Sequence, residues 1–127
     1  CKFEHFATML EQVEQSERLA FCLDTCHLLA AGYDFRTPQG YDQMLNAWDA
    51  LVGIERIRVI HLNDSKKDLG CRVDRHEHIG QGCIGTKGFE LLLNDPRLSA
   101  LPMVLETPKD DNADVRNLQT LRSLIHG

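Results

Sequence analysis

The sequence lacks the features of membrane and secreted proteins. No stretch approaches the roughly 20 apolar residues that a helix needs to span a bilayer, and the amino end has neither the basic nor the apolar segment of a secretory signal. The five cysteines form an odd set without a Cys-x-x-Cys pair, which does not match a secreted disulfide framework. We therefore predict an intracellular, cytoplasmic protein without a membrane partner.

The chain also has fewer basic than acidic residues. The formal net charge is -5 at pH 7, so the chain as a whole would not attract a phosphate backbone over long distances. A nucleic-acid partner would have to be held by local basic residues and by bound cations, which reverse the sign of the local charge. Gly80-Gln81-Gly82 lacks a Walker lysine and a complete dinucleotide fingerprint, so these glycines indicate loop geometry.

What the sequence does have is an alternation of helical and strand patterns. Its 127 residues, 43% of them hydrophobic, predict one packed domain. Helical spacing covers 2–15, 37–53, 89–93 and 115–125, and strand-like apolar runs cover 19–23, 57–62 and 102–105. The continuous run 19–23 predicts a strand that is buried on both faces. The alternation predicts an α/β fold with a parallel sheet, in which functional residues gather at the carboxyl ends of the strands.

Three metal-ligand residues lie at these strand ends. Asp24, His61 and Glu106 each stand at or within about a residue of an end, which places them on one edge of a parallel sheet. Taken singly, Asp24 could be a helix N-cap, His61 a satisfied core histidine and Glu106 one half of an ion pair. Their coincidence favours a metal site.

Three more candidates come from nearby segments. Asp74 and His76 are alternate residues of the long 65–85 loop and predict a pair on one side of an extended segment, although a solvated loop face would also explain them. His27 lies three residues after Asp24 and could equally be a buried histidine. All six residues offer the oxygen and nitrogen ligands that zinc or manganese sites use, so together they predict a polynuclear metal site.

Basic residues and cysteines beside these candidates have weaker signals. Arg75, between two of the predicted ligands, and Lys66 are candidates for contact with DNA phosphates, although a lysine is more often simply solvated. The spacing Cys22-x-x-x-Cys26 could suggest a thiolate zinc site, but Cys22 fits the strand interior and no second cysteine pair exists, so we interpret both as core or incidental residues.

Several segments resemble signatures of the endonuclease IV family of abasic-site DNA repair enzymes, a zinc-dependent branch of the xylose-isomerase-like barrels. The segments are Asp24-Thr25-Cys26-His27, Ala31-Gly32-Tyr33-Asp34, His61-Leu62-Asn63-Asp64-Ser65-Lys66, and residues 72–80 with 82–85. The resemblance extends over essentially the whole chain. It implies that residues 1–127 are the carboxyl-terminal part of one barrel domain: a partial TIM (β/α)8 barrel with its last three parallel strands and their helices.

The resemblance also implies a role for each candidate ligand. Asp24, His61 and Glu106 would bind one zinc, and His27, Asp74 and His76 a neighbouring zinc. The family uses three zinc ions, and the residues of this chain account for at most two of them. The parent protein would be a deoxyribonuclease IV of base excision repair. It would act as a monomer and hydrolyse the phosphodiester on the 5′ side of an abasic site in double-stranded DNA.

Two other functions stay open. A metal-dependent sugar isomerase or epimerase on the same barrel would also carry Asp, Glu and His at its strand ends, although the 72–76 segment argues against it. The 127-residue chain by itself could instead be a non-catalytic metal-binding fragment. We expect it to have little or no nuclease activity, and its open sheet edges predict self-association.

Overall fold

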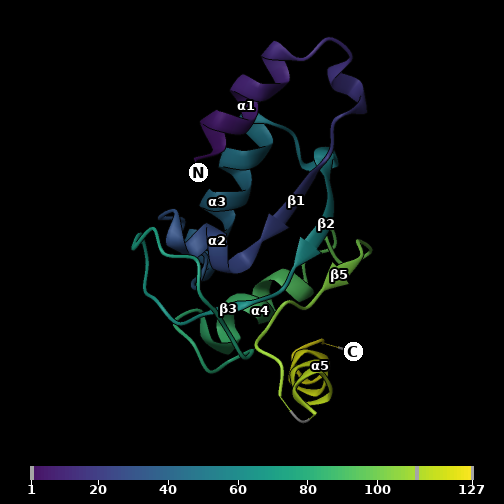
Figure 1. Ribbon diagram of the computed structural model, residues 1–127. Coiled ribbons are helices and arrows are strands. Elements are labelled where there is room, and N and C mark those ends of the chain that lie inside the picture. Colours follow the sequence, from purple (N-terminus) through teal and green to yellow (C-terminus); the bar gives the residue numbers. More distant parts are fainter. Residues whose placement is uncertain (1, 111, 127) are drawn as a thin grey trace.

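A three-stranded parallel sheet is the centre of the molecule, shown in the computed structural model in Figure 1, which describes residues 2–110 and 112–126. Strands β1 (Phe21–Asp24), β2 (Ile57–His61) and β5 (Met103–Val104) lie in the order β1-β2-β5, and both neighbouring pairs are parallel. The predicted partial α/β barrel is therefore confirmed.

Helices precede and follow these strands, as the hydrophobic spacing predicted. They are α1 (Phe3–Gln12), α2 (Thr25–Ala30), α3 (Pro38–Leu51), α4 (Gly85–Leu93) and α5 (Ala113–Ser123), with short 3-10 turns η1 (Ser16–Arg18) and η2 (Ile54–Arg56). The Thr37 hydroxyl accepts a hydrogen bond from the Gly40 N–H at 3.1 Å, which confirms the predicted cap of α3. The separate helix α2 was not in the predicted order. None of the described helices is long and apolar enough to cross a lipid bilayer.

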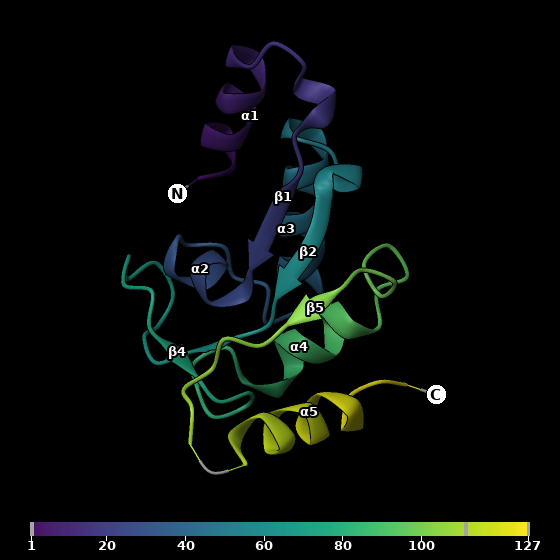
Figure 2. The same ribbon diagram turned by 45° about the vertical axis from the view of Figure 1, so that its right-hand side comes forward.

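The strand register separates the two faces of the sheet. Leu23 lies opposite Ile60, and both are buried beneath the helices. Cys22 lies opposite Val59 on the other face and is exposed, so the prediction that 19–23 is buried on both faces was wrong. Of the two interpretations of Cys22, core or incidental, the structure contradicts the first. The reason is that the described helices pack on one face: in Figure 2, α3 lies behind β1 and β2, and α4 lies beneath β5.

The core lies between the sheet and the helices, and its largest member is Trp48. This indole is 1% exposed, contacts Phe3 edge-on at 5.1 Å between ring centroids, and donates a hydrogen bond to the Gly53 carbonyl at 2.9 Å. The end of the chain is packed less fully than predicted. The helical spacing over 115–125 rests on apolar residues at one side of an amphipathic helix, yet of these Leu121 is buried whereas Val115 and Leu118 are exposed, because α5 contacts mainly α4.

The 65–85 segment was predicted to be a loop without periodic structure, and it contains one short pairing. Strands β3 (Asp64–Ser65) and β4 (His76–Glu77) are antiparallel. Asp64 is completely buried, and its carboxylate accepts hydrogen bonds from five backbone N–H groups, those of Ser65, Gly80, Gly82, Ile84 and Gly85. This carboxylate therefore holds the glycine-rich segment against the end of β2.

Candidate metal centre

The first group of candidate ligands lies on the helix-free face, at the carboxyl ends of the strands. Asp24 and His61 are direct partners in the β1–β2 register, and Glu106 follows β5 on the same side. One ligand atom from each residue lies within 4.8 Å of the other two. His61 Nδ1 contacts the Glu106 carboxylate directly and lies 3.8 Å from Asp24 Oδ2. The structure thus brings together three residues that are far apart in the sequence.

Asp24 was interpreted both as a helix N-cap and as a metal ligand. Its two carboxylate oxygens lie in positions that suit one of these roles each. Oδ1 accepts a hydrogen bond from the His27 backbone N–H at 3.0 Å and forms the N-cap of α2. Oδ2 faces the imidazoles of His61 and His76 at 3.8 and 3.7 Å. One carboxylate oxygen therefore starts the helix while the other remains directed at the candidate site.

His76 is oriented as a metal-binding histidine would be. Its Nδ1 lies 2.8 Å from the Glu106 carbonyl oxygen. Because a carbonyl can only accept, this contact places the proton on Nδ1 and leaves a lone pair on Nε2 of the neutral ring. Nε2 lies 3.7 Å from Asp24 Oδ2 and 3.4 Å from Asp74 Oδ1, so three acceptors face one another. A cation between them would satisfy all three, so the donor set fits a zinc-type ion.

A second group of neighbouring ligand atoms includes a residue beside the predicted set. Cys26 Sγ, and not His27, completes with Asp74 and His76 a set whose ligand atoms all lie within 4.8 Å of one another among the described residues. His27 Nδ1 still lies 3.8 Å from Asp74 Oδ2. The His27 side chain is 43% exposed, about as much as that of Asp74, whereas Cys26 is completely buried.

Cys26 is completely buried, as its interpretation as a core residue predicted, yet it borders the site. Its thiol donates to the Arg75 carbonyl at 3.4 Å. Burial, together with a hydrogen bond with the Asp74 side chain, raises the pKa of this thiol to about 12. The group is therefore a neutral thiol beside Asp74. The sequence signals for this placement were its position one residue before His27 and the Cys22-x-x-x-Cys26 spacing.

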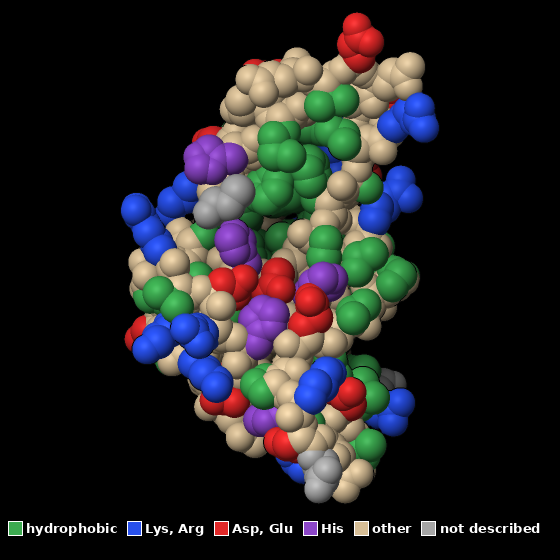
Figure 3. Space-filling model, in the orientation of Figure 1, with side chains coloured by type: hydrophobic (Ala, Val, Ile, Leu, Met, Phe, Trp, Pro, Cys, Tyr) green, Lys and Arg blue, Asp and Glu red, His purple; other side chains and the backbone are tan. Residues whose placement is uncertain are grey.

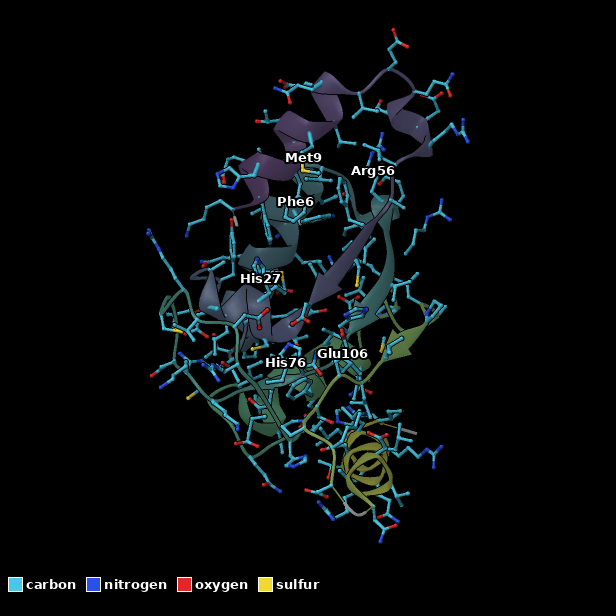
Figure 4. The ribbon with its side chains drawn as sticks, in the orientation of Figure 1. Phe6, Met9, His27, Arg56, His76 and Glu106 are labelled. Carbon is cyan, nitrogen blue, oxygen red and sulfur yellow. The ribbon has the colours of Figure 1, made fainter. Side chains whose placement is uncertain are left out.

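Figures 3 and 4 show how these side chains gather. Acidic and histidine side chains form a compact patch in the middle of the face in Figure 3, below a hydrophobic area. In Figure 4, the labelled His27, His76 and Glu106 come from α2, the 65–85 segment and the end of β5 and lie around this patch. A cavity of about 360 Å³ adjoins the patch, lined by Lys2, His5, His27, Ala30, Ala31, Arg72 and Asp74.

The two predicted phosphate contacts lie beside this centre. The Lys66 backbone N–H donates to the Arg75 carbonyl at 2.9 Å, next to the β3–β4 pairing, and both side chains are exposed. Both side chains are therefore accessible to an anionic partner.

Comparisons with known proteins agree on one family. The family described as "Xylose isomerase-like TIM barrel" matches residues 1–124. The "Probable endonuclease 4" of Chloroflexus aurantiacus is 56% identical over 128 residues, which cover 99% of this chain and 45% of that protein. The "Probable endonuclease 4" of Chloroflexus aggregans is 58% identical over 126 residues, covering 98% of this chain and 44% of that protein.

A solved structure gives the same result. The crystal structure of endonuclease IV from Thermus thermophilus superposes with a TM-score of 0.84 at 42% sequence identity, covering 97% of this chain and 43% of that one. The present chain thus spans somewhat less than half the length of the relatives that it matches.

Proposed function

Because the chain belongs to the endonuclease IV family of xylose isomerase-like TIM barrels, we propose that its whole protein is a deoxyribonuclease IV, a metal-dependent phosphoric diester hydrolase of base excision repair. Its substrate would be double-stranded DNA with an abasic site, cleaved at the phosphodiester on the 5′ side. Residues 1–127 would be the carboxyl-terminal part of its single barrel domain.

One observation carries this proposal: His76 Nε2 faces the carboxylate oxygens of Asp24 and Asp74 at 3.7 and 3.4 Å. An arrangement of acceptors around a common point, with the opposite imidazole nitrogen bound to a carbonyl, is typical of metal ligands supported by a second layer of hydrogen bonds. A parallel-sheet enzyme also has its active site at this end of the strands.

We propose zinc as the metal, with manganese as the alternative. Asp24, His61 and Glu106 would hold one ion; Asp74 and His76 would hold a second, with His27 as the third ligand. Clustered zinc ions, when bound, would lower the pKa of a coordinated water from 15.7 to about 7 and offset negative charge on the phosphate. Three zinc ions in the whole protein are part of the same proposal, and these six residues supply ligands for at most two.

The protein's own residues would orient the substrate. Arg75 and Lys66, which are exposed and stand beside the second ligand group along the chain, would bind DNA phosphates. The net charge of -5 means that this local pair, with the metal ions, must supply the attraction that the whole chain lacks.

The test is a cleavage assay of the protein expressed from its complete coding sequence. Zinc-loaded protein should nick a duplex with one abasic site and leave a 3′-hydroxyl that a polymerase can extend, and it should leave the matched intact duplex uncut. Sugar isomerisation without any nicking would establish the isomerase alternative instead. The 127-residue chain tested in parallel should show little or no nicking, and efficient nicking by it would contradict its proposed inactivity.

A further inference from the structure

Asn63 connects the segment of Asp24 with that of Glu106 in the candidate metal centre. The sequence marked it only as a member of the 61–66 signature and not as a candidate site residue. It follows β2 closely and is completely buried. Its Nδ2 donates to Asp24 Oδ2 at 3.2 Å, and its Oδ1 accepts from the Glu106 backbone N–H at 2.8 Å. We infer that Asn63 is a positioning residue that sets the geometry of Asp24 and Glu106 for metal binding, an inference that rests on the proposed function.

The direction of these hydrogen bonds defines the orientation of the amide. The Glu106 backbone N–H can only donate, so the oxygen of the Asn63 amide must face it. The NH2 group is then left to face Asp24, whose ionised carboxylate can only accept. An asparagine therefore satisfies both neighbours, whereas an aspartate at this position would satisfy Glu106 but set a second carboxylate oxygen against Asp24.

Asn63 is itself held in place by the neighbouring strand. Its backbone N–H donates to the Thr25 hydroxyl at 2.9 Å, and that hydroxyl donates to the Asn63 carbonyl at 2.6 Å. Thr25 is completely buried and is the first residue of α2, directly after Asp24. The backbone of Asn63 is thus anchored to the strand end that carries Asp24, and its side chain reaches across to the one that carries Glu106.

The hydrogen bonds made by Asn63 leave carboxylate lone pairs of Asp24 and Glu106 available to a metal ion. The Asn63 amide occupies one acceptor position on Asp24 Oδ2, and the α2 cap occupies one on Oδ1. A carboxylate has about four such positions, so Asp24 keeps lone pairs for a cation while neither oxygen can rotate freely. On the other side, Asn63 binds the backbone of Glu106, and the carboxylate of Glu106 remains next to His61. Removal of a partner of this kind typically weakens metal affinity about 10- to 100-fold.

The experiment compares Asn63→Ala and Asn63→Asp with the unchanged protein, all expressed from the complete coding sequence and stripped of metal. Co²⁺ serves as the probe, because its visible absorption reports ligand geometry and zinc competition then gives affinity. Asn94→Ala is the matched control, because the Asn94 side chain binds the Glu90 and Leu124 carbonyls and the His126 N–H at the end of α4. Folding of each apoprotein is checked by circular dichroism.

We expect both Asn63 variants to fold, to bind metal at least about 10-fold more weakly and to shift the Co²⁺ spectrum. Asn94→Ala should also fold, and it should change neither the metal affinity nor the Co²⁺ spectrum. Amide exchange at Glu106 should accelerate in Asn63→Ala and remain slow in Asn63→Asp, which keeps the accepting oxygen. Unchanged affinity and spectrum in a folded variant would overturn the inference but not the metal centre. Absence of Co²⁺ binding by the unchanged protein would overturn both. Failure of both variants to fold would show a structural role and overturn the inference alone.

Discussion

Replacement of Asp64 by asparagine should destabilise the fold strongly, although the two side chains have nearly the same shape. The Asp64 carboxylate is completely buried and accepts five backbone hydrogen bonds between 2.7 and 3.2 Å. Oδ1 accepts two of them, from Ser65 and Ile84, and Oδ2 accepts the other three. Every one of these partners is a donor, so the site suits a group that only accepts.

The magnitude follows from the number of donors that lose their acceptor. In its better orientation, the asparagine NH2 would replace Oδ1 and leave the N–H groups of Ser65 and Ile84 unpaired. A buried polar group without a partner costs about 1–3 kcal/mol. Two such groups predict a loss of about 2–6 kcal/mol, which is a large fraction of the roughly 5–15 kcal/mol that stabilises a typical domain.

Urea unfolding measures this loss directly. The midpoint of Asp64→Asn should fall at an unchanged slope, whereas the control Asp114→Asn, an exposed aspartate paired with Lys109, should lose no more than about 1 kcal/mol. Gly82→Ala should destabilise the same site, because its Cβ would lie 2.6 Å from Asp64 Oδ1. A loss below about 1 kcal/mol in Asp64→Asn would refute the view that this carboxylate organises the 80–85 segment.

Three further predictions concern metal, pH and DNA. Asp24→Asn should keep the cap of α2, since asparagine caps as well as aspartate. It should lose most of the thermal stabilisation by zinc, which is about 2.7 kcal/mol at 100 times Kd for the unchanged protein. An equal zinc-induced shift of Tm in both proteins would count against the ligand role. Burial opposes ionisation of Asp95, but hydrogen bonds from Arg97 and a buried tyrosine outweigh it and hold its pKa below the usual value. The ionised Asp95 should therefore stabilise the fold fully above about pH 4 and progressively less as the pH falls further. In urea unfolding, Asp95→Asn should have a lower free energy of unfolding than the unchanged protein at pH 7, and this difference should shrink below about pH 4. A difference that does not change with pH would contradict this. Arg75→Ala should weaken binding of abasic and intact duplexes alike and reduce the salt slope of the binding constant by about 0.9. Arg58→Ala is the control, because Arg58 lies at the amino end of β2, away from the carboxyl ends of the strands, and it should leave the slope unchanged. The opposite ranking in a fluorescence titration would exclude Arg75 as a phosphate contact.

Much of the candidate centre could be predicted from local sequence because its ligands stand at recognisable positions. Apolar runs that end at Asp24, His61 and Glu106 mark strand ends, and parallel strands bring such ends to one edge. The alternation of Asp74 and His76 correctly predicted neighbouring side chains, whose Oδ1 and Nε2 lie 3.4 Å apart. Whether these residues bind metal stays a prediction.

Contacts between distant segments could not be predicted in the same way. Nothing in the neighbourhood of Cys26 shows that its thiol lies within 4.8 Å of ligand atoms of Asp74 and His76, because this depends on how α2 packs against the 65–85 segment. The exposure of Val115 likewise depends on which side of α5 meets α4 and not on its spacing.

The sequence by itself determined the α/β order, the strand ends and the chemical nature of the six candidate ligands, since periodicity and residue type are local properties of the chain. Only the tertiary structure decided which atoms face one another. The register sets Asp24 beside His61, and the closing of β2 against its two neighbours buries Asn63 between Asp24 and Glu106. Such contacts join residues 39 and 43 positions apart, so they depend on how the strands pack and not on any local pattern.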